Sequence, residues 1–215
     1  MSANHIHPEM PAAGGADPAA RAPHILIVCT GNICRSPLAE QLLRESLIAA
    51  GIDAIVTSAG THAMTGSAMT PEAAALSSQY GASKTDHVAR QLTEKLIADA
   101  DLVLTATRDH RREVVTLWPK ATRYTFTLNQ FARLLEPAET ATPMPSPAAA
   151  RPRLDFATYI ADIASTRGLH PSPTPATLDD VDDPYRQSAA VYARAAASIN
   201  ASVTTITAAF VAAGA

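Results

Sequence analysis

The sequence predicts an α/β fold, a three-layer sandwich in which a four-stranded parallel sheet is flanked by helices. Short apolar runs rich in Ile, Val and Leu alternate with segments of helical periodicity along most of the chain. The runs are continuously apolar, which is typical of strands that are buried on both faces. Residues that start and stop helices bound the segments between the runs. Strands that alternate with helices in this way indicate a parallel sheet.

The first strand and helix lie near the N-terminus. HILIVCT (24–30) is an apolar run that predicts a buried strand. In SPLAEQLLRESLIAAG (36–51) leucines recur near the helical period. Ser36 is predicted to be the N-cap, Pro37 fits the first helical position, and Gly51 ends the helix. The residues between the two elements therefore form a strand-to-helix turn.

The same alternation continues to residue 136. Three further strands are predicted at AIVTSAG (54–60), DLVLTAT (101–107) and RYTFTL (123–128). Helices are predicted at TPEAAALSSQYG (70–81), TEKLIADA (93–100), RDHRREVVTLW (108–118, ending before Pro119) and NQFARLLE (129–136). Thr70 is the expected N-cap of the first of these helices.

The rest of the chain divides into a tail, one domain and an insertion. Residues 1–22 are rich in Ala, Pro and Gly and predict a flexible tail, and 23–215 predict a single domain. Within it, 137–178 holds half of the prolines and predicts a Pro/Ala-rich insertion. LDFATYIADIAS (154–165) has the pattern of one amphipathic helix inside the insertion. A long helix at 188–213 is expected to pack on the sheet.

Composition and charge limit the classes of partner and site. The net charge is −3 and basic residues form no run, so we expect no nucleic-acid partner. No apolar run approaches the roughly 20 residues that span a bilayer, and the start has no basic-then-apolar leader, so we expect no membrane and a cytoplasmic location. Two cysteines are too few for a disulfide framework, and no His/Cys cluster predicts a metal site.

Both cysteines lie in CTGNICRS (29–36), the strand-to-helix turn. Such a turn can point successive backbone N–H groups inward as a cradle for an anion, and the following helix adds positive charge at the same place. The planar fork of Arg35 can hold two oxygens of one phosphate. We therefore expect a phosphate-binding loop above the sulfur of Cys29, made of Thr30, Gly31, Asn32, Ile33, Cys34, Arg35 and Ser36.

The same environment predicts that Cys29 is a nucleophile. A helix N-terminus and an arginine stabilise a thiolate, which can attack phosphorus. Ser36 is expected to donate a hydrogen bond to that sulfur. Gly31 and Asn32 tolerate the left-handed backbone that a tight ring needs. Cys34 is expected to form a protective disulfide with Cys29 under peroxide, although its small size for packing would also explain its presence.

Attack on a phosphate ester also needs an acid to protonate the leaving oxygen. DDVDDPYRQ (179–187) places four aspartates just before the last helix. Asp183 precedes Pro184 in a stiffened loop and is the predicted acid. Asp182 is the competing choice.

These residues resemble a known family. VCTGNICRSPLAE (28–40), with DDPY (182–185) far downstream, resembles the low-molecular-weight protein tyrosine phosphatases. The resemblance extends through TSAGTHAM (57–64), HVARQL (87–92) and ADLVLTAT (100–107). It implies a four-stranded parallel sheet, a phosphocysteine intermediate, no metal or other cofactor, a phosphotyrosine-containing protein as substrate and inorganic phosphate as product.

The resemblance also implies roles for individual residues. The nucleophile corresponds to Cys29, the phosphate clamp to Arg35 and the acid to Asp183. Asn32 and Ser36 correspond to the residues that brace the loop.

The substrate pocket departs from the family pattern. The family often has two aromatic residues after Asp-Pro, but here Tyr185 is followed by Arg186. Thr61, His62 and Met64 fall in the variable specificity loop, which has no large aromatic residue. We take Thr61, His62 and Tyr185 as the substrate-pocket residues. Protein arginine phosphatases tend to carry Thr where Ile33 stands, so Ile33 favours a phosphotyrosine pocket.

Two alternatives to this function stay open. One is an arsenate reductase of the same fold, although the chain has no cysteine beyond Cys34 to pass a disulfide outward. The other is a phosphate-binding regulatory module with little turnover.

The Ala-rich composition favours a bacterial source. His62, His87 and His110 are expected at the surface or in capping roles, and Arg90 either pairs with an acidic loop residue or is an ordinary surface arginine.

Overall fold

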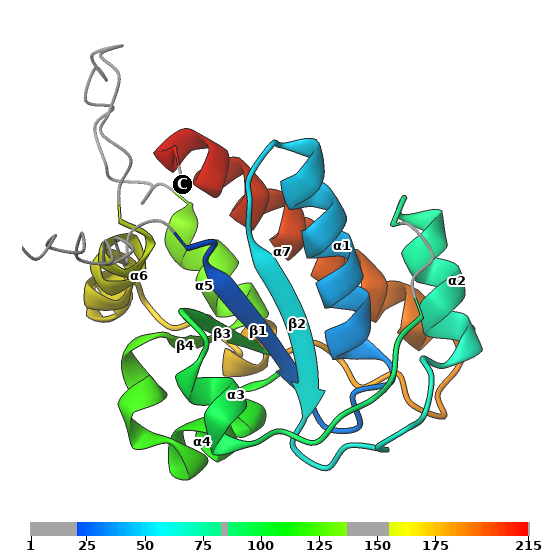
Figure 1. Cartoon of the computed structure of the whole chain (residues 1–215). Coiled ribbons are helices and arrows are strands. Elements are labelled where there is room, and N and C mark those ends of the chain that lie inside the picture. Colours follow the sequence, from blue (N-terminus) through cyan, green and yellow to red (C-terminus); the bar gives the residue numbers. More distant parts are fainter. Residues whose placement is uncertain (1–20, 83–85, 137–154, 215) are drawn as a thin grey trace, which may run out of the picture.

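The parallel sheet has the predicted strands. The structure is a computed structural model that describes residues 21–82, 86–136 and 155–214. Its strands are β1 (His24–Cys29), β2 (Ile55–Gly60), β3 (Leu102–Thr105) and β4 (Thr125–Thr127), all parallel in the order β2-β1-β3-β4 (Figure 1). The chain therefore passes from β1 to β2 on one side and later to β3 on the other. In such sheets ligands bind beyond the carboxyl ends of the strands at this switch point.

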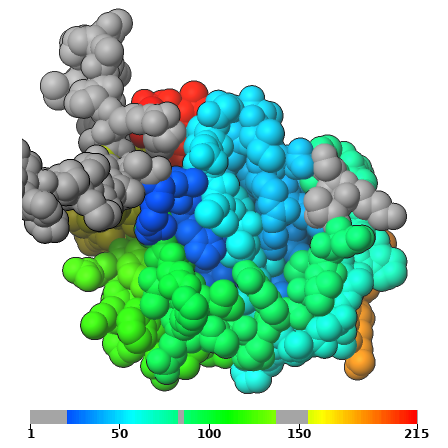
Figure 2. Space-filling model, in the orientation of Figure 1, coloured from blue at the N-terminus to red at the C-terminus, as the bar shows by residue number. Residues whose placement is uncertain are grey.

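Helices cover both faces of the sheet, which confirms the predicted three-layer fold (Figure 1). Helices α1 (Arg35–Ala49), α5 (Leu128–Leu135) and α7 (Ala189–Ala213) share one apolar cluster with Ile25 and Ile27 of β1. Helices α3 (Glu94–Ala98) and α4 (Arg108–Leu117), with the 3₁₀ helix η2 (Pro119–Arg123), pack on the opposite face against Leu26 and Val28. Successive residues of β1 thus alternate between the two layers. The residues of α3, α4 and η2 are green in Figure 2, where green residues cover the lower left and centre of the face shown.

Helix α7 is the longest helix in the described part of the chain. By length and composition alone it could cross a membrane. In this structure one face of the helix packs on the core, where Ile199, Val203 and Ile206 are buried in the same cluster as α1 and α5, whereas Val211 is exposed. This packing confirms the prediction that the C-terminal helix lies on the sheet.

The predicted insertion contains the predicted amphipathic helix. Helix α6 (Phe156–Ser165) is followed by the 3₁₀ helices η3 (Thr166–Gly168) and η4 (Ala176–Asp179). The ring of Phe156 contacts that of Phe210 with centroids 5.5 Å apart, so the aromatic residues of α6 join the core. Figure 1 shows α6 beside α5 and the C-terminal end of α7. Residues 137–154 of the insertion and 1–20 of the tail lie outside the described residues.

Threonine side chains cap four of the described helices, including the predicted cap at Thr70, but the predicted cap at Ser36 is absent. The hydroxyl oxygens of Thr70, Thr93, Thr107 and Thr127 accept backbone N–H bonds at the starts of α2 (Pro71–Gln79), α3, α4 and α5. The prediction for Ser36 is wrong, because α1 begins at Arg35 with Cys34 as the N-cap residue and no side-chain cap bond. The Ser36 hydroxyl instead bonds inside the strand-to-helix loop.

Candidate active site

The loop between β1 and α1 begins at a buried cysteine and ends at a buried arginine. Cys29 is the last residue of β1 and Arg35 is the first residue of α1. Asn32 has a φ of 55°, as predicted, whereas Gly31 is not left-handed. The prediction for Gly31 is therefore wrong, because one left-handed residue is enough to close this turn. No N–H group of residues 31–34 donates to a protein acceptor in the described part of the chain.

Asn32 braces the loop from within. Its side chain is fully buried, and Nδ2 donates to the hydroxyl oxygens of Ser36 at 2.9 Å and Ser58 at 2.8 Å. The backbone N–H of Arg90 donates to Oδ1 of Asn32 at 2.9 Å. A ring nitrogen of His87 lies 2.6 Å from the carbonyl oxygen of Asn32. These contacts tie the loop to β2 and to the segment before α3.

The sulfur of Cys29 has one hydroxyl partner. Sγ of Cys29 lies 3.0 Å from Oγ of Ser36. Because Nδ2 of Asn32 donates to this same oxygen, the hydroxyl proton of Ser36 is available to the sulfur. A hydroxyl that donates to sulfur stabilises the thiolate relative to the thiol. The geometry expected for Ser36 is therefore present.

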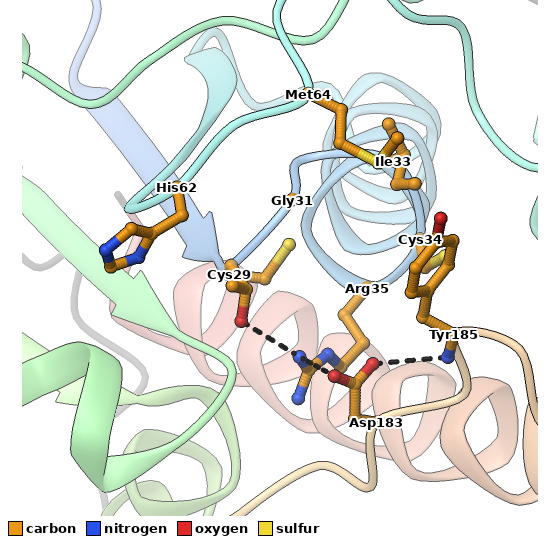
Figure 3. Close-up of a pocket in the computed structure, with 10 residues that line it drawn as sticks. Cys29, Gly31, Ile33, Cys34, Arg35, His62, Met64, Asp183 and Tyr185 are labelled. Atoms are coloured by element: carbon orange, nitrogen blue, oxygen red, sulfur yellow. Dashed lines mark hydrogen bonds and ion pairs between the residues drawn. The ribbon is translucent and has the colours of Figure 1, made fainter.

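Arg35 joins the loop to the segment before α7. The guanidinium is buried, with Nη1 donating to the carbonyl oxygen of Val181 at 3.1 Å. Its Nη2 lies 3.1 Å from Oδ2 of Asp183 and 3.5 Å from Oγ1 of Thr30. Figure 3 shows the Asp183 carboxylate reaching up to this guanidinium from a segment far along the chain. A phosphate held by Arg35 would therefore lie beside Asp183.

A pocket opens over the sulfur of Cys29. It is lined by Cys29, Thr30, Gly31, Ile33, Cys34, Arg35, His62, Met64, Asp183 and Tyr185. Met64 is the lining residue that our set of predicted site residues omitted, although the sequence places it in the variable loop. Figure 3 shows Ile33, Met64 and Tyr185 around the pocket and the His62 ring turned away from the sulfur. No lining residue comes from the described part of the insertion.

The remaining predicted residues lie around the pocket. Asn32 and Ser36 are buried behind the loop. Thr61 does not line the pocket, and its backbone N–H donates to the carbonyl oxygen of Cys29 at 2.9 Å. Asp182 points elsewhere, since its Oδ2 lies 3.5 Å from Nη2 of Arg194. Of the two candidate acids, Asp183 alone faces the pocket.

Comparison with known proteins identifies the family. A family model described as low molecular weight phosphotyrosine protein phosphatase matches residues 24–166. The chain belongs to this family. It is 41% identical over 106 residues to a probable low molecular weight protein-tyrosine-phosphatase, EpsP, of Ralstonia solanacearum. The matched segment covers 49% of this chain and 70% of that protein. It is also 38% identical over 108 residues to the protein-arginine-phosphatase of Bacillus subtilis. That match covers 50% of this chain and 71% of the relative.

Solved structures of phosphatases share the fold. The crystal structure of the Erwinia amylovora tyrosine phosphatase AmsI superposes with a TM-score of 0.60 at 23% identity, covering 88% of this chain and 93% of that one. The Vibrio vulnificus protein Wzb in complex with benzylphosphonate superposes with a TM-score of 0.61 at 22% identity, covering 87% and 99%. The four-stranded parallel sheet with flanking helices is thus the fold of low molecular weight phosphatases.

In this phosphatase His110 supports the loop, which the sequence analysis missed. His110 comes from the first turn of α4, directly after β3, and its side chain is buried. Nε2 lies 2.8 Å from Oγ1 of Thr30, and Nδ1 lies 2.7 Å from Oγ1 of Thr107. Burial, and then the charge of Arg35, lower the pKa of His110 to about 4. The sequence places His110 directly after a predicted strand, but only the fold shows that this strand adjoins β1.

The second cysteine of the phosphatase loop is in a different environment from the first. Sγ of Cys34 lies 3.5 Å from Oγ1 of Thr70 and 3.6 Å from the hydroxyl of Tyr192. Burial raises the pKa of the Cys34 thiol. Both cysteines are free thiols in this structure. The protective disulfide with Cys29 stays a prediction.

The other basic side chains near the pocket have structural partners. Nδ1 of His62 lies 3.6 Å from a carboxylate oxygen of Glu113 on α4, and both side chains are exposed. Nε of Arg90 donates to the carbonyl oxygen of Ser58 at 2.8 Å, and within the described residues it forms no ion pair. Of the two alternatives left open for Arg90, pairing with an acidic loop residue is therefore not seen in the described part of the chain. No cluster of three or more His, Cys, Asp or Glu side chains suited to a metal occurs among residues 21–82, 86–136 and 155–214.

Proposed function

We propose that this protein hydrolyses phosphotyrosine monoesters in proteins through a phosphocysteine on Cys29. The observation that carries the proposal is the set of donors around one sulfur. Arg35 and four consecutive N–H groups that bond no protein acceptor in the described chain belong to the loop that starts at Cys29. Buried N–H groups without partners are rare, so an anion is their expected partner. A phosphate held there has its phosphorus directly over a nucleophile.

In the first step the Cys29 thiolate attacks phosphorus. The sulfur–phosphorus bond forms as the bond from phosphorus to the tyrosine oxygen breaks. Asp183 gives its proton to the leaving oxygen, and Arg35 with the loop N–H groups holds the phosphoryl oxygens, where charge develops. The phosphate takes the guanidinium edge that Asp183 occupies in this structure, 3.1 Å away. Substrate binding thereby frees Asp183 for the leaving group.

In the second step water attacks the phosphocysteine. The Asp183 carboxylate accepts a proton from the water, and the sulfur–phosphorus bond breaks. Inorganic phosphate leaves, and Cys29 returns to the thiolate, which the Ser36 hydroxyl stabilises from 3.0 Å. Water is the only co-reactant, and Asp183 ends in the protonated form in which it began.

The pocket walls support phosphotyrosine as the substrate. Ile33, Met64 and Tyr185 offer apolar and aromatic surface beside the phosphate position. A flat phenyl ring packs well on such surface. The guanidinium of phosphoarginine would need several hydrogen-bond acceptors, whereas among these three side chains the Tyr185 hydroxyl is the one strong acceptor, and an unpaired polar group is costly to bury. We expect kcat/KM for a phosphotyrosine peptide to exceed that for the matched phosphoarginine peptide.

Turnover of p-nitrophenyl phosphate and a phosphotyrosine peptide tests the proposal. Cys29→Ala should abolish turnover, and Asp183→Asn should lower kcat for the peptide by about 10²–10⁴-fold. Asp182→Asn is the matched control and should have little effect, because its partner is Arg194 and not the pocket. A wild-type protein that binds phosphate without turnover would instead support a phosphate-binding module. Reduction of arsenate without ester hydrolysis would support the arsenate reductase.

We also propose the setting in which the enzyme acts. The Ala-rich composition and the bacterial relatives support a bacterial source. The net charge of −3 and the packing of one face of α7 on the core support a cytoplasmic location with no nucleic-acid or membrane partner. We propose a single catalytic domain at 23–215 with an insertion at 137–178 and a tail at 1–22. Fractionation of the source cells with an antibody to the protein tests the location.

A further inference from the structure

Each aspartate in the segment 179–183 pairs with an arginine from a different helix. The pairs run from Asp179 to Arg133 of α5, from Asp180 to Arg108 of α4, from Asp182 to Arg194 of α7 and from Asp183 to Arg35 of α1. We call this segment the acid loop. A run of acidic residues before a helix is usually a solvated surface. Here four different helices hold it instead.

The pair between Asp180 and Arg108 has the most contacts. Nε of Arg108 lies 3.2 and 3.1 Å from the two carboxylate oxygens of Asp180, and Nη2 lies 2.9 Å from Oδ2. The backbone N–H of Arg108 also donates to Oδ1 at 2.8 Å, at the start of α4. A forked pair of this kind fixes orientation as well as distance. Asp180 is therefore held to the helix that carries His110.

The pair between Asp179 and Arg133 is the more buried one. The Asp179 side chain is 9% exposed, and its two oxygens accept from Nε and Nη2 of Arg133 at 3.2 and 2.9 Å. Nδ2 of Asn129, also on α5, donates to the carbonyl oxygens of Leu178 and Asp180 at 3.2 and 3.3 Å. These contacts fix the backbone where the insertion returns to the domain.

The held residues lie next to the proposed acid in the chain. The buried residue Val181 donates its N–H to the carbonyl oxygen of Ala106 at 2.8 Å and accepts from Arg35 at 3.1 Å. The Asp183 side chain, in contrast, is 56% exposed, so little packing positions it. Its location depends on the backbone that leads to it. A general acid must lie within hydrogen-bond reach of the leaving oxygen, and a displacement of about 1 Å can cost about 10²-fold in rate.

We propose that Asp180 with Arg108, and Asp179 with Arg133, are positioning residues that aim the carboxyl group of Asp183 at the leaving oxygen. This inference rests on the proposed phosphatase function. It assigns the forked pairs a role in proton transfer in addition to any contribution to stability. Asp179 and Asp180 follow directly after the insertion, whose last residue, Leu178, is held to α5 by Asn129.

The dependence of rate on the leaving group tests the proposal. Phenyl phosphate has a poor leaving group and needs the acid, whereas p-nitrophenyl phosphate has a good one and needs it little. We expect Asp180→Asn and Arg108→Gln to lower kcat/KM, which reports the first step alone, at least about tenfold more for phenyl phosphate than for p-nitrophenyl phosphate, a part of the roughly 10²–10⁴-fold that a general acid supplies. The matched controls are Asp109→Asn and Arg112→Gln, an exposed pair on the same helix with 2.8 Å between its charged atoms. They should leave the ratio of the two rates unchanged.

A second comparison separates positioning from folding. In an Asp183→Asn background, adding Asp180→Asn should not change the ratio further, because the acid is already absent. Arg108→Lys keeps the charge, loses the fork and should give an intermediate ratio, which provides a test if the other variants do not fold. An equal loss of kcat/KM for both esters, or a further change of the kcat/KM ratio in the Asp183→Asn background, would overturn the proposal.

The outcomes distinguish this inference from the proposed function. If the wild-type protein hydrolyses neither ester, both fail. If it hydrolyses both esters and Asp183→Asn alone alters their ratio, the phosphatase function stands and the positioning role is overturned.

Discussion

At the scale of single residues, the Ser36 hydroxyl connects the sulfur to its support. It lies 3.0 Å from Sγ of Cys29 and accepts from Asn32 at 2.9 Å. A hydroxyl in this position can donate a hydrogen bond to the thiolate that attacks in the first step and to the sulfur that leaves in the second step, and so stabilises both. The contact with sulfur was predicted, and so was a capping role, but α1 begins at Arg35, so Ser36 lies inside the helix and its hydroxyl accepts from Asn32 instead.

We expect Ser36→Ala to lower kcat by roughly 10- to 100-fold, because a hydrogen bond to a charged group is worth about 1.5–3 kcal/mol. Steady-state turnover of p-nitrophenyl phosphate measures the effect. Ser58→Ala is the matched control, since Ser58 also accepts from Asn32, at 2.8 Å, but has no contact with the sulfur. Equal losses in the two variants would show that bracing of Asn32, and not the bond to sulfur, is what matters.

The lowered pKa of His110 makes the stability of the folded protein depend on pH. Its pKa is lowered from 6.5 to about 4 in the folded protein, mainly by burial, so the unfolded chain binds a proton between these values that the folded protein does not. Its contribution to stability is therefore complete above pH 6.5 and is lost as the pH falls toward 4. Because the unfolded chain binds this extra proton, the free energy of unfolding should be about 2 kcal/mol lower at pH 5 than above pH 6.5.

Urea unfolding at pH 7 and pH 5 measures this contribution. His110→Gln keeps a polar group that can bond Thr30 and cannot titrate. The difference in unfolding free energy between the two pH values should be smaller in His110→Gln than in the wild type. The same difference in both proteins would contradict the assignment of a neutral, buried His110.

At the scale of elements, the end of β2 limits the position of the loop. A Cβ atom built on Gly60 would lie 2.4 Å from the carbonyl oxygen of Thr30 and 3.0 Å from Cα of Ala63. Both neighbours are backbone atoms that cannot rotate away. Glycine at the end of β2 therefore allows the close approach of the phosphate-binding loop.

We expect Gly60→Ala to destabilise the protein by about 1–3 kcal/mol, as overpacking typically does, and to lower kcat because Thr30 must move. Thermal unfolding and turnover of p-nitrophenyl phosphate measure the two effects. Gly66→Ala serves as a control for loss of glycine, because a Cβ there meets nothing within 4 Å, although its φ of 85° adds some strain. A fully active, fully stable Gly60→Ala would contradict the close approach.

Local patterns predicted most elements, but not their contacts across the fold. Apolar runs and capping residues gave the strands and helices, and the spacing from Cys29 to Arg35 gave the loop. The role of His110 depends on the adjacency of β1 and β3, which no local pattern contains. The arginine partners of the acid loop come from four separate helices, so only the folded chain shows which charges meet.

At the scale of the whole molecule, the site collects residues from distant parts of the chain. β1 supplies Cys29 at its carboxyl end, and the segment after β2 supplies His62 and Met64. The acid loop returns after the insertion and places Asp183 against Arg35. All of these segments meet at the switch point of the sheet, where α/β folds bind ligands.

The central claim is that phosphate is transferred to the sulfur of Cys29. The most direct test is to mix Asp183→Asn with p-nitrophenyl phosphate, quench within one turnover and map the phosphorylated peptide by mass spectrometry. The good leaving group lets the first step proceed, while loss of the Asp183 carboxylate slows hydrolysis of the intermediate. We predict one phosphoryl group on Cys29, and none on Cys29→Ala treated in the same way. A phosphoryl group on another residue, or turnover by Cys29→Ala, would contradict the mechanism.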